Sequence, residues 1–371
     1  MSRKLRIAYF VHSLRSDWNN GNAHFLRGLV REMSFRGHDM VAFEPRCGWS
    51  IKNLLEEPCG EAALGQFTQM YPELRIQEYE ANTLSQRNLW LKALKDFDIV
   101  VMHEWNSPEL ADALLEVRDK VKYRLLFHDT HHRAASAPNE IEMLRVDRFD
   151  AVVVFGEILR RIYREAFGIS RAWTLHEAAD TRVFHPVEDP TKEQDVVWVG
   201  NWGDEERSQE IHEFLLCSAE KMADRQFKTY GVRYPKEALS ALRTAGVAYG
   251  GYLPNLEVPR VYGVSRLTVH IPRQQYARKM LGIPTIRVFE ALACGIPLIS
   301  APWQDMENLF REGDLLFVDS GEAMGCAIQR LLERPREAAA QAERGRETVL
   351  ARHTCAHRAA QLEAICEEVL R

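Results

Sequence analysis

Short apolar runs alternate with longer amphipathic stretches along most of the chain. The apolar runs predict buried strands, and between them apolar residues recur at helical spacing, as at Phe25, Leu29 and Met33 in a helix predicted over residues 23–35. The predicted strands cover residues 5–12, 40–43, 71–79, 98–103, 123–127, 151–155, 195–199, 227–231, 247–253, 267–271 and 315–318. Strands that alternate with helices favour an α/β fold with parallel sheets.

This pattern is interrupted once by a polar, proline-containing stretch at residues 188–194, EDPTKEQ. After it the pattern starts again with a strand, a loop containing Gly200 and Asn201, and a helix that begins near Ser208. We therefore predict two doubly wound domains, 1–187 and 188–355, and two closing helices over about 321–333 and 336–370.

The segment 282–300, GIPTIRVFEALACGIPLIS, carries the clearest local signals. Pro284 ends any preceding helix, and Thr285 is a good N-cap for a helix that runs to about Cys294. Gly295 can adopt the left-handed conformation that ends a helix. The residues that follow start a short buried strand, so the segment predicts a helix that packs on a sheet.

Arg287 and Glu290 lie on one face of this predicted helix, close to its start. Free N–H groups near Thr285, Ile286 and Arg287, together with the helix dipole, attract phosphate. The Arg287 guanidinium adds a fixed cation, and Glu290 could accept hydrogen bonds from ribose hydroxyls. This arrangement suits a nucleotide diphosphate, whereas the alternative is an ordinary ion pair on an exposed helix.

The run from Glu290 through Gly295 to Pro297 resembles the donor-binding signature of retaining GT-B glycosyltransferases, in which a Glu-x7-Glu motif binds the donor. Glu290 matches the second Glu, which binds the donor ribose in that family. The first Glu, which reaches the donor sugar, would fall at Gly282, so this chain departs from the motif there. A branch related to spore-maturation proteins carries the same Arg-x-Phe-Glu-Ala-x-Ala-Cys-Gly run without the first Glu and matches more closely.

The resemblance implies a GT-B fold, that is, two Rossmann-like domains with parallel sheets that face each other across a cleft. The first domain would bind the acceptor and the second the nucleotide sugar, while residues 356–371 would cross back to the first domain. The implied reaction is transfer of a sugar from a UDP-sugar or GDP-sugar to an acceptor hydroxyl. Retention of configuration is implied, and no metal or other cofactor is expected because arginines would carry the charge of the diphosphate.

The resemblance also assigns candidate roles to single residues. The expected donor-binding residues are Gly21, Gly200, Asn201, Arg207, Tyr252, Leu253, Arg273, Pro284, Thr285, Ile286, Arg287 and Glu290. The expected catalytic residues are His128, Asp129, Arg207 and Arg287. Arg207 could instead be a solvated side chain among Asp204, Glu205 and Glu206, and Arg273 could belong to a solvated basic loop with Arg278 and Lys279.

Polar residues also follow two strands predicted in the first half. His103 and Glu104 end one of them and are candidate cleft residues, unless they form a polar loop on the rim of the sheet. The run from His128 to His132 follows the next strand. Its spacing does not favour a metal site. The resemblance implies instead that His128 faces the donor sugar, with a helix-capping role as the alternative, and Asp129 is the candidate base.

Composition limits the partners. The chain has 371 residues and a net charge of −5, which gives no reason to expect nucleic-acid binding, and the resemblance implies a nucleotide sugar as the ligand. No apolar run reaches the length of a membrane span, and the N-terminal run is interpreted as a strand, not a signal peptide. Seven cysteines without a Cys-x-x-Cys pair are typical of reduced thiols in a cytoplasm.

The acceptor is left open between a bacterial surface glycan, a protein and a small metabolite. Two other functions also fit the sequence. The chain could be an epimerase or hydrolase that acts on a nucleotide sugar, or a binding protein without catalysis in which Gly282 is the lesion.

Overall fold

The computed structural model describes residues 3–203 and 206–371. The chain divides into two compact units: unit 1 comprises residues 1–177 and 355–371, and unit 2 comprises 178–354. The division precedes the boundary expected at 187/188, because the segment after residue 177 already packs within unit 2. Phe184 is fully buried, and the Ala179 N–H donates to His353 O at 3.1 Å.

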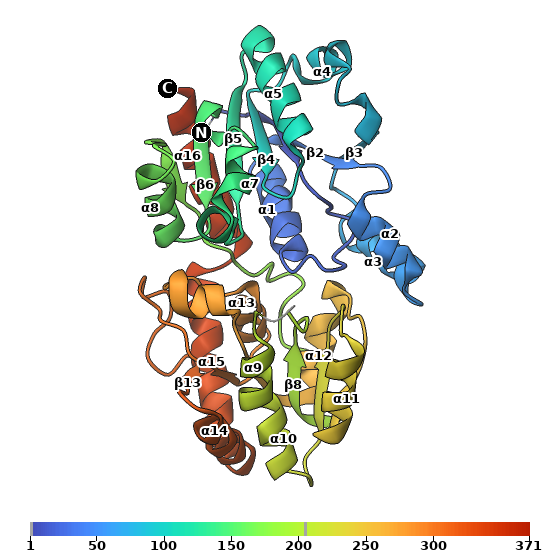
Figure 1. Ribbon diagram of the computed structural model, residues 1–371, viewed down its shortest axis with the longest axis vertical. Helices are drawn as coiled ribbons and strands as arrows, with labels where there is room; N and C mark the ends of the chain where they lie inside the picture. Colours follow the sequence, from blue (N-terminus) through green and yellow to red (C-terminus); the bar gives the residue numbers. More distant parts are fainter. Residues whose placement is uncertain (1–2, 204–205) are drawn as a thin grey trace. The chain divides into compact units, whose positions relative to one another are not determined.

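The described part of unit 1 contains a seven-stranded parallel sheet in the order β3-β2-β1-β4-β5-β6-β7 (Figure 1). Its strands are β1 Arg6–Phe10, β2 Asp39–Pro45, β3 Ile76–Tyr79, β4 Ile99–His103, β5 Arg124–Asp129, β6 Ala151–Val154 and β7 Ala172–Thr174. β5 extends beyond the predicted end at residue 127 because His128 and Asp129 pair with neighbouring strands. Both polar residues therefore lie in the sheet, not in the loop after it.

Helices surround this sheet. They are α1 Ala23–Phe35, α2 Trp49–Glu56, α3 Gly60–Met70, α4 Arg87–Leu94, α5 Pro108–Val121, α6 Arg133–Ser136, α7 Pro138–Glu142, α8 Glu157–Glu165 and α16 Cys355–Leu370. Figure 1 shows α16 (red) against α1 (blue), although the two are far apart in the sequence. The prediction of a helix over residues 23–35 is confirmed.

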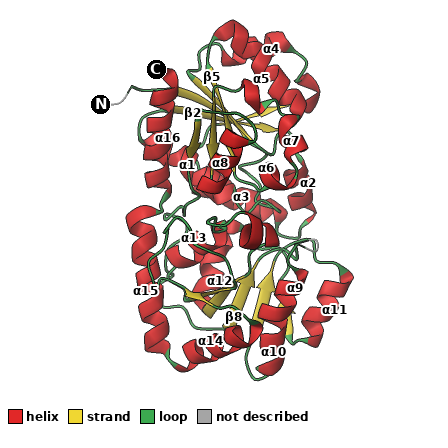
Figure 2. Cartoon of the chain, turned by 60° about the vertical axis from the view of Figure 1, so that its left-hand side comes forward, coloured by secondary structure: helices red, strands yellow, loops and turns green. Residues whose placement is uncertain are grey.

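The described part of unit 2 contains a six-stranded parallel sheet in the order β10-β9-β8-β11-β12-β13. The strands are β8 Gln194–Val199, β9 Phe227–Tyr230, β10 Val247–Tyr249, β11 Ser265–His270, β12 Leu298–Ser300 and β13 Leu316–Phe317. β10 ends before the predicted residue 253, because two glycines follow it and Gly251 has a positive φ of 71°. Figure 2 shows helices on both faces of these strands.

The helices of unit 2 are α9 Ser208–Ile211, α10 Cys217–Lys221, α11 Lys236–Thr244, α12 Val258–Val264, α13 Ile286–Ala293, α14 Gly321–Glu333 and α15 Pro335–Arg352, with π-helical turns at His212–Leu216 and Gln275–Lys279. The prediction for α13 is confirmed, including the left-handed Gly295 at its end, with φ 65°. The single helix predicted over 336–370 is wrong. It breaks at His353, whose Nε2 donates to Leu309 O at 2.7 Å.

Both sheets reverse their strand order once, between β1 and β4 in unit 1 and between β8 and β11 in unit 2. In doubly wound sheets, ligands bind beyond the carboxyl ends of the strands at such a reversal point. The expectation of two Rossmann-like α/β domains is therefore confirmed, and each unit has one edge where a site is expected.

Candidate functional site

Unit 2 has a small cavity of about 20 Å³ at the reversal point of its sheet, with room for about one water-sized group. The carboxyl ends of β8 and β11 and the first turn of α13 surround it. Its lining residues are Trp198, Val199, Arg207, Tyr262, Thr268, Val269, His270, Ile271, Thr285, Arg287 and Leu298. The structure thus brings three predicted donor-binding residues, Arg207, Thr285 and Arg287, to one cavity.

Arg207 is held by backbone carbonyl groups and an aromatic ring. It donates to Asn201 O and, at 3.2 Å, to Ile271 O, and its guanidinium lies 5.2 Å from the centre of the Trp198 ring. Among the described residues, no carboxylate lies within ion-pair distance of it; Asp204 and Glu205 lie outside the described residues. Burial, with the nearby charges of Arg273 and Arg287, lowers the pKa of Arg207 to about 9. The cavity therefore favours an anion.

The first turn of α13 faces this cavity without a side-chain cap. Thr285 occupies the predicted N-cap position, but its hydroxyl contacts His270 Nε2 at 2.9 Å and caps no N–H group. The first N–H groups of a helix have no partner within the helix. Phosphate binding at this turn, expected at Thr285, Ile286 and Arg287 with Pro284 before them, stays a prediction.

A hydrogen-bond chain decides which nitrogen of His270 carries the proton. Ser300 Oγ donates to Ala301 O at 2.9 Å, so it must accept from His270 Nδ1 at 2.8 Å. Burial and the charge of Arg207 lower the pKa of His270 to about 3, so the ring is neutral. Its Nε2 then accepts from Thr285. The sequence analysis missed His270, although its place at the end of a predicted strand was a usable signal.

Arg287 and Glu290 form the ion pair that their spacing predicts. The pair is not on an exposed helix face, however: the Glu290 side chain is fully buried and a quarter of the Arg287 side chain is exposed. Glu290 lies close enough to Tyr262 and Cys294 that its charge, in addition to burial, raises the pKa of both groups. Arg287 thus lines the cavity with Glu290 behind it.

Four more of the predicted donor residues, Gly200, Asn201, Tyr252 and Leu253, follow β8 and β10. Gly200 has to be glycine, because a Cβ would lie 2.8 Å from the Trp198 ring. Asn201 Oδ1 accepts from the Val232 N–H at 2.9 Å and so joins two loops. Tyr252 and Leu253 are half-buried beyond β10. A role for these residues in binding the base or the phosphates stays a prediction.

Arg273, expected near the phosphates, forms an ion pair with Glu206. Arg278 in the same loop pairs with Glu210 at 3.3 Å. The basic loop is therefore joined to the segment that carries Arg207, and the Arg273 charge contributes to lowering the pKa of Arg207. A direct contact of Arg273 with the donor stays a prediction.

The backbone explains why position 282 departs from the family motif. Gly282 is buried and has φ 105°, a conformation that side-chain-bearing residues rarely adopt. A Cβ there would lie 3.3 Å from Met306 Cβ and 3.5 Å from Glu307 Oε1. A glutamate at 282 would thus be strained, and the carboxylate of Glu307 already lies beside that position.

Unit 1 gathers polar side chains at the reversal point of its own sheet. Glu104, fully buried, lies 2.9 Å from His103 Nε2 and accepts from Thr130 Oγ1 at 3.0 Å. Burial alone would raise the pKa of Glu104, but the His103 charge and hydrogen bond lower it to about 2. Asn22 Nδ2 donates to Thr130 Oγ1 at 2.9 Å, which ties the start of α1, next to the predicted Gly21, to this cluster.

The two predicted catalytic residues of unit 1 are both buried. His128 Nδ1 contacts the Tyr9 hydroxyl, and Asp129 accepts from Tyr163 OH at 2.6 Å and from the His131 N–H at 2.9 Å. Burial and the charge of Glu104 raise the pKa of Asp129 to about 7. The structure therefore joins His128 with His103 and Glu104 in one cluster, whereas Asp129 faces Tyr163 of α8.

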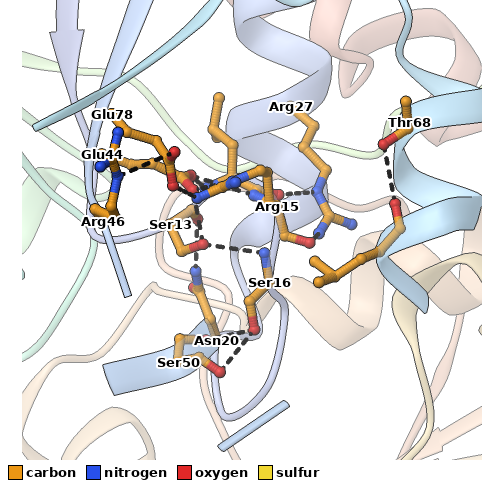
Figure 3. Close-up of polar contacts among 12 residues, drawn as sticks. Ser13, Arg15, Ser16, Asn20, Arg27, Glu44, Arg46, Ser50, Thr68 and Glu78 are labelled. Carbon is orange, nitrogen blue, oxygen red and sulfur yellow. Dashed lines mark hydrogen bonds and ion pairs between the residues drawn. The ribbon is translucent and has the colours of Figure 1, made fainter. Parts of the chain in front are cut away.

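The loop between β1 and α1 is held rigid by buried charged groups (Figure 3). Glu44, fully buried, accepts from the Leu14 N–H at 2.9 Å and pairs with Arg15. Arg27 donates to Leu14 O and, at 3.1 Å, to Arg15 O, and it pairs with Asp17. This loop leads to Gly21, so the approach to the polar cluster is preorganised.

Comparisons with known proteins agree with this geometry. Residues 207–364 match a protein-family model described as glycosyl transferase-like. A search of curated proteins finds no match. Among solved structures, the fold is similar to Anabaena HepE in complex with UDP and glucose, with 13% identity, TM-score 0.72, 98% of this chain and 100% of that chain covered.

Two further solved structures share the fold. Sucrose-phosphate synthase from Thermosynechococcus elongatus is 16% identical, with TM-score 0.69 and 99% of each chain covered. An α-glucosyltransferase in complex with UDP and a DNA 13-mer is 12% identical, with TM-score 0.70, 98% of this chain and 100% of that chain covered. At these identities the likeness shows the fold, and the fold is that of the GT-B glycosyltransferases.

Two features of the described residues bear on other partners. They contain no helix with the length and apolar character needed to cross a bilayer. Within the same residues, no three His, Cys, Asp or Glu side chains are grouped so as to hold a metal ion.

Proposed function

We propose that this chain, which has the GT-B fold, is a glycosyltransferase whose unit 2 binds a UDP-sugar, and that the sugar is transferred to the hydroxyl group of an acceptor. UDP is the nucleotide present in the HepE and α-glucosyltransferase structures, which supports it over GDP. The bond between the anomeric carbon and the diphosphate oxygen breaks, and a bond to the acceptor oxygen forms.

The observation that carries the proposal is the cavity of unit 2. Arg207 and Arg287 line it together with the uncapped first turn of α13, and Arg207 has no carboxylate partner among the described residues. Stabilising the charge that develops on the leaving group is the main catalytic task in such a transfer. Two guanidinium groups and a helix N-terminus can provide this stabilisation, so we propose that the reaction needs no metal.

We propose retention of the anomeric configuration, in line with the resemblance of the segment around Glu290 to the retaining family. In that case the acceptor approaches from the side on which the diphosphate leaves. The departing phosphate oxygen is then the nearest group that can take the acceptor's proton. Glu290 would bind the ribose from its buried place behind Arg287.

Calorimetric titration with UDP and UDP-glucose tests the site. Arg207→Met should weaken UDP binding by about 10- to 100-fold, as expected when a hydrogen bond to a charged group is lost. It should weaken binding of uridine much less, because uridine has no phosphate. Arg266→Met is the matched control, because Arg266 also belongs to unit 2, lies on β11 and pairs with Asp195 at 3.2 Å. Equal losses in both variants would contradict the proposal.

A turnover assay separates the alternatives. Release of UDP that requires an acceptor supports transfer, and conversion without an acceptor would instead indicate an epimerase or hydrolase. Tight binding without any turnover would indicate an inactive binding protein. The same assay with and without EDTA tests metal independence, which requires equal rates.

A further inference from the structure

Three arginine side chains lie near one another at the cavity of unit 2, and two of them already hold a carboxylate. Arg287 pairs with Glu290, and Arg273 pairs with Glu206. Arg207 donates to backbone carbonyl groups instead. Burial, followed by the charges of Arg273 and Arg287, lowers the pKa of Arg207 to about 9, so the three guanidinium groups lie within electrostatic range of one another. An anion that binds here therefore competes with carboxylates of the protein itself.

The two ion pairs differ in their burial. The Glu290 side chain is fully buried, so moving Arg287 away from it would leave a buried charge without its cation, which is costly. The side chains of Arg273 and Glu206 are 30% and 25% exposed. Water can solvate both groups when this pair opens, and partly exposed pairs contribute little net free energy. Arg273 is therefore the arginine that can change partners.

The Glu206 carboxylate keeps a second partner when Arg273 leaves. Its Oε2 accepts from Arg273, whereas its Oε1 accepts from Gln275 Nε2 at 3.0 Å. The backbone also joins the two segments, because the Gln274 N–H donates to Glu206 O at 2.9 Å. The exchange consequently requires a movement of the Arg273 side chain and no movement of the loop that carries it.

A phosphate group is a suitable replacement for the Glu206 carboxylate. The guanidinium presents a planar fork of N–H donors, which matches carboxylate and phosphate oxygens alike. The positive charges of Arg207 and Arg287 attract a diphosphate to the same place. A diphosphate at the cavity can therefore take Arg273 from Glu206, whereas a nucleoside without phosphate cannot.

We propose that Glu206 is an internal competitor of the diphosphate: the ligand takes Arg273 from Glu206 when it binds, and Glu206 takes Arg273 back when UDP leaves. The proposal rests on the proposed function, because it describes how unit 2 releases UDP after the transfer. Three arginines would otherwise hold this product tightly, and product release limits the turnover of many enzymes. Glu206 is a positioning residue in this scheme, since it acts through Arg273 and does not touch the donor.

Calorimetric titration of the full chain with UDP and uridine tests the exchange. Glu206→Gln removes the competing charge and should tighten UDP binding by about 2- to 5-fold, the range expected for a partly exposed ion pair. Uridine affinity should not change. Arg273→Met should weaken UDP binding. In the double variant Glu206→Gln/Arg273→Met the gain should disappear, because no guanidinium is left to compete for.

Glu210→Gln is the matched control. Glu210 pairs with the exposed Arg278 at 3.3 Å and so joins the same two segments as Glu206 does. If loosening of these segments, and not release of Arg273, raised the affinity, Glu210→Gln would raise it too. We expect no gain from this variant. The proposal is overturned by an equal gain in Glu210→Gln, by a gain that persists without Arg273, or by weaker or unchanged UDP binding in Glu206→Gln.

A kinetic measurement separates this role from a merely structural one. Stopped-flow displacement of a fluorescent UDP analogue by UDP gives the rate of release, which should be lower in Glu206→Gln by about the same factor as the affinity gain. An unchanged release rate would refute the exchange. If Glu206→Gln does not fold, Glu206→Asp takes its place: it keeps the charge on a shorter side chain, and its smaller gain should also depend on Arg273.

Failure of the proposed function would give a different result. Absence of UDP binding to the wild type would contradict that function, and the same variants would then be titrated with inorganic pyrophosphate, which has the diphosphate group without the nucleoside. Tighter pyrophosphate binding in Glu206→Gln that depends on Arg273 would support the exchange by itself. Absence of pyrophosphate binding as well would overturn both proposals.

Discussion

The buried ionisable side chains differ between the two units: unit 2 has an arginine at its cavity, and unit 1 has two carboxyl groups. In unit 2, Arg207 donates to backbone carbonyl groups, and burial lowers its pKa to about 9. In unit 1, the charge of His103 outweighs burial and lowers the pKa of Glu104, whereas burial, followed by the charge of Glu104, raises the pKa of Asp129. The pKa values of these two buried carboxyl groups thus differ widely, which is a usual sign of a functional site.

Asp129 should make stability depend on pH. Its pKa is raised to about 7, so between about pH 4 and pH 7 the folded chain holds a proton that the unfolded chain has released. Stability then falls as pH rises through this window, by at most about 1.4 kcal/mol per pH unit. Asp129→Asn removes this dependence, so urea unfolding from pH 5 to pH 7 should show the wild type losing stability relative to the variant. Asp119→Asn, a change at an exposed carboxylate, should show no such trend; a constant difference for Asp129→Asn would contradict the assignment.

The residues that line the cavity of unit 2 come together where secondary-structure elements begin or end. α13 begins after Thr285, whose hydroxyl contacts His270 Nε2. Arg207 donates to Asn201 O and Ile271 O, which lie just beyond the ends of β8 and β11. The stretch before α13 depends on Gly282, because only glycine adopts its φ of 105° without strain. The local backbone therefore disfavours a glutamate at position 282, where the family motif has its first Glu.

Gly282→Ala should lower the free energy of unfolding by about 1–3 kcal/mol, the usual cost of such a conformation for a residue with a side chain. Gly325→Ala is the control: Gly325 lies inside α14, and its added Cβ would meet only Ser218 Oγ at 3.9 Å. That change should stabilise the protein slightly, by about 0.4–1 kcal/mol. Urea denaturation measures both, and stabilisation by both changes would refute the backbone argument.

Unit 1 is built from two separate parts of the chain, residues 1–177 and the C-terminal residues 355–371. α16 packs on α1, and its Glu363 pairs with Arg36 and with the buried His38. Arg358 of the same helix donates to His176 O at 2.8 Å. Unit 2, by contrast, is one continuous segment, residues 178–354.

Deletion of residues 355–371 should therefore destabilise unit 1 selectively. Limited proteolysis of the shortened chain should degrade unit 1 and leave a protected fragment close to residues 178–354. UDP should still slow cleavage of that fragment, because the cavity of unit 2 lies within it. Equal resistance of unit 1 with and without the last helix would show that α16 is dispensable for its stability.

Patterns in the amino-acid sequence alone predict the alternation of strands and helices, the two halves, and α13 with its boundaries at Thr285 and Gly295. These features depend on apolar periodicity and on residues that start or stop a helix, which act within a few positions. Tertiary structure decided the partners of His103, His128 and His270, the pairing of Arg273 with Glu206, and the break at His353. Strand register and loop contacts bring residues together that are far apart in the chain, and no local signal encodes such contacts.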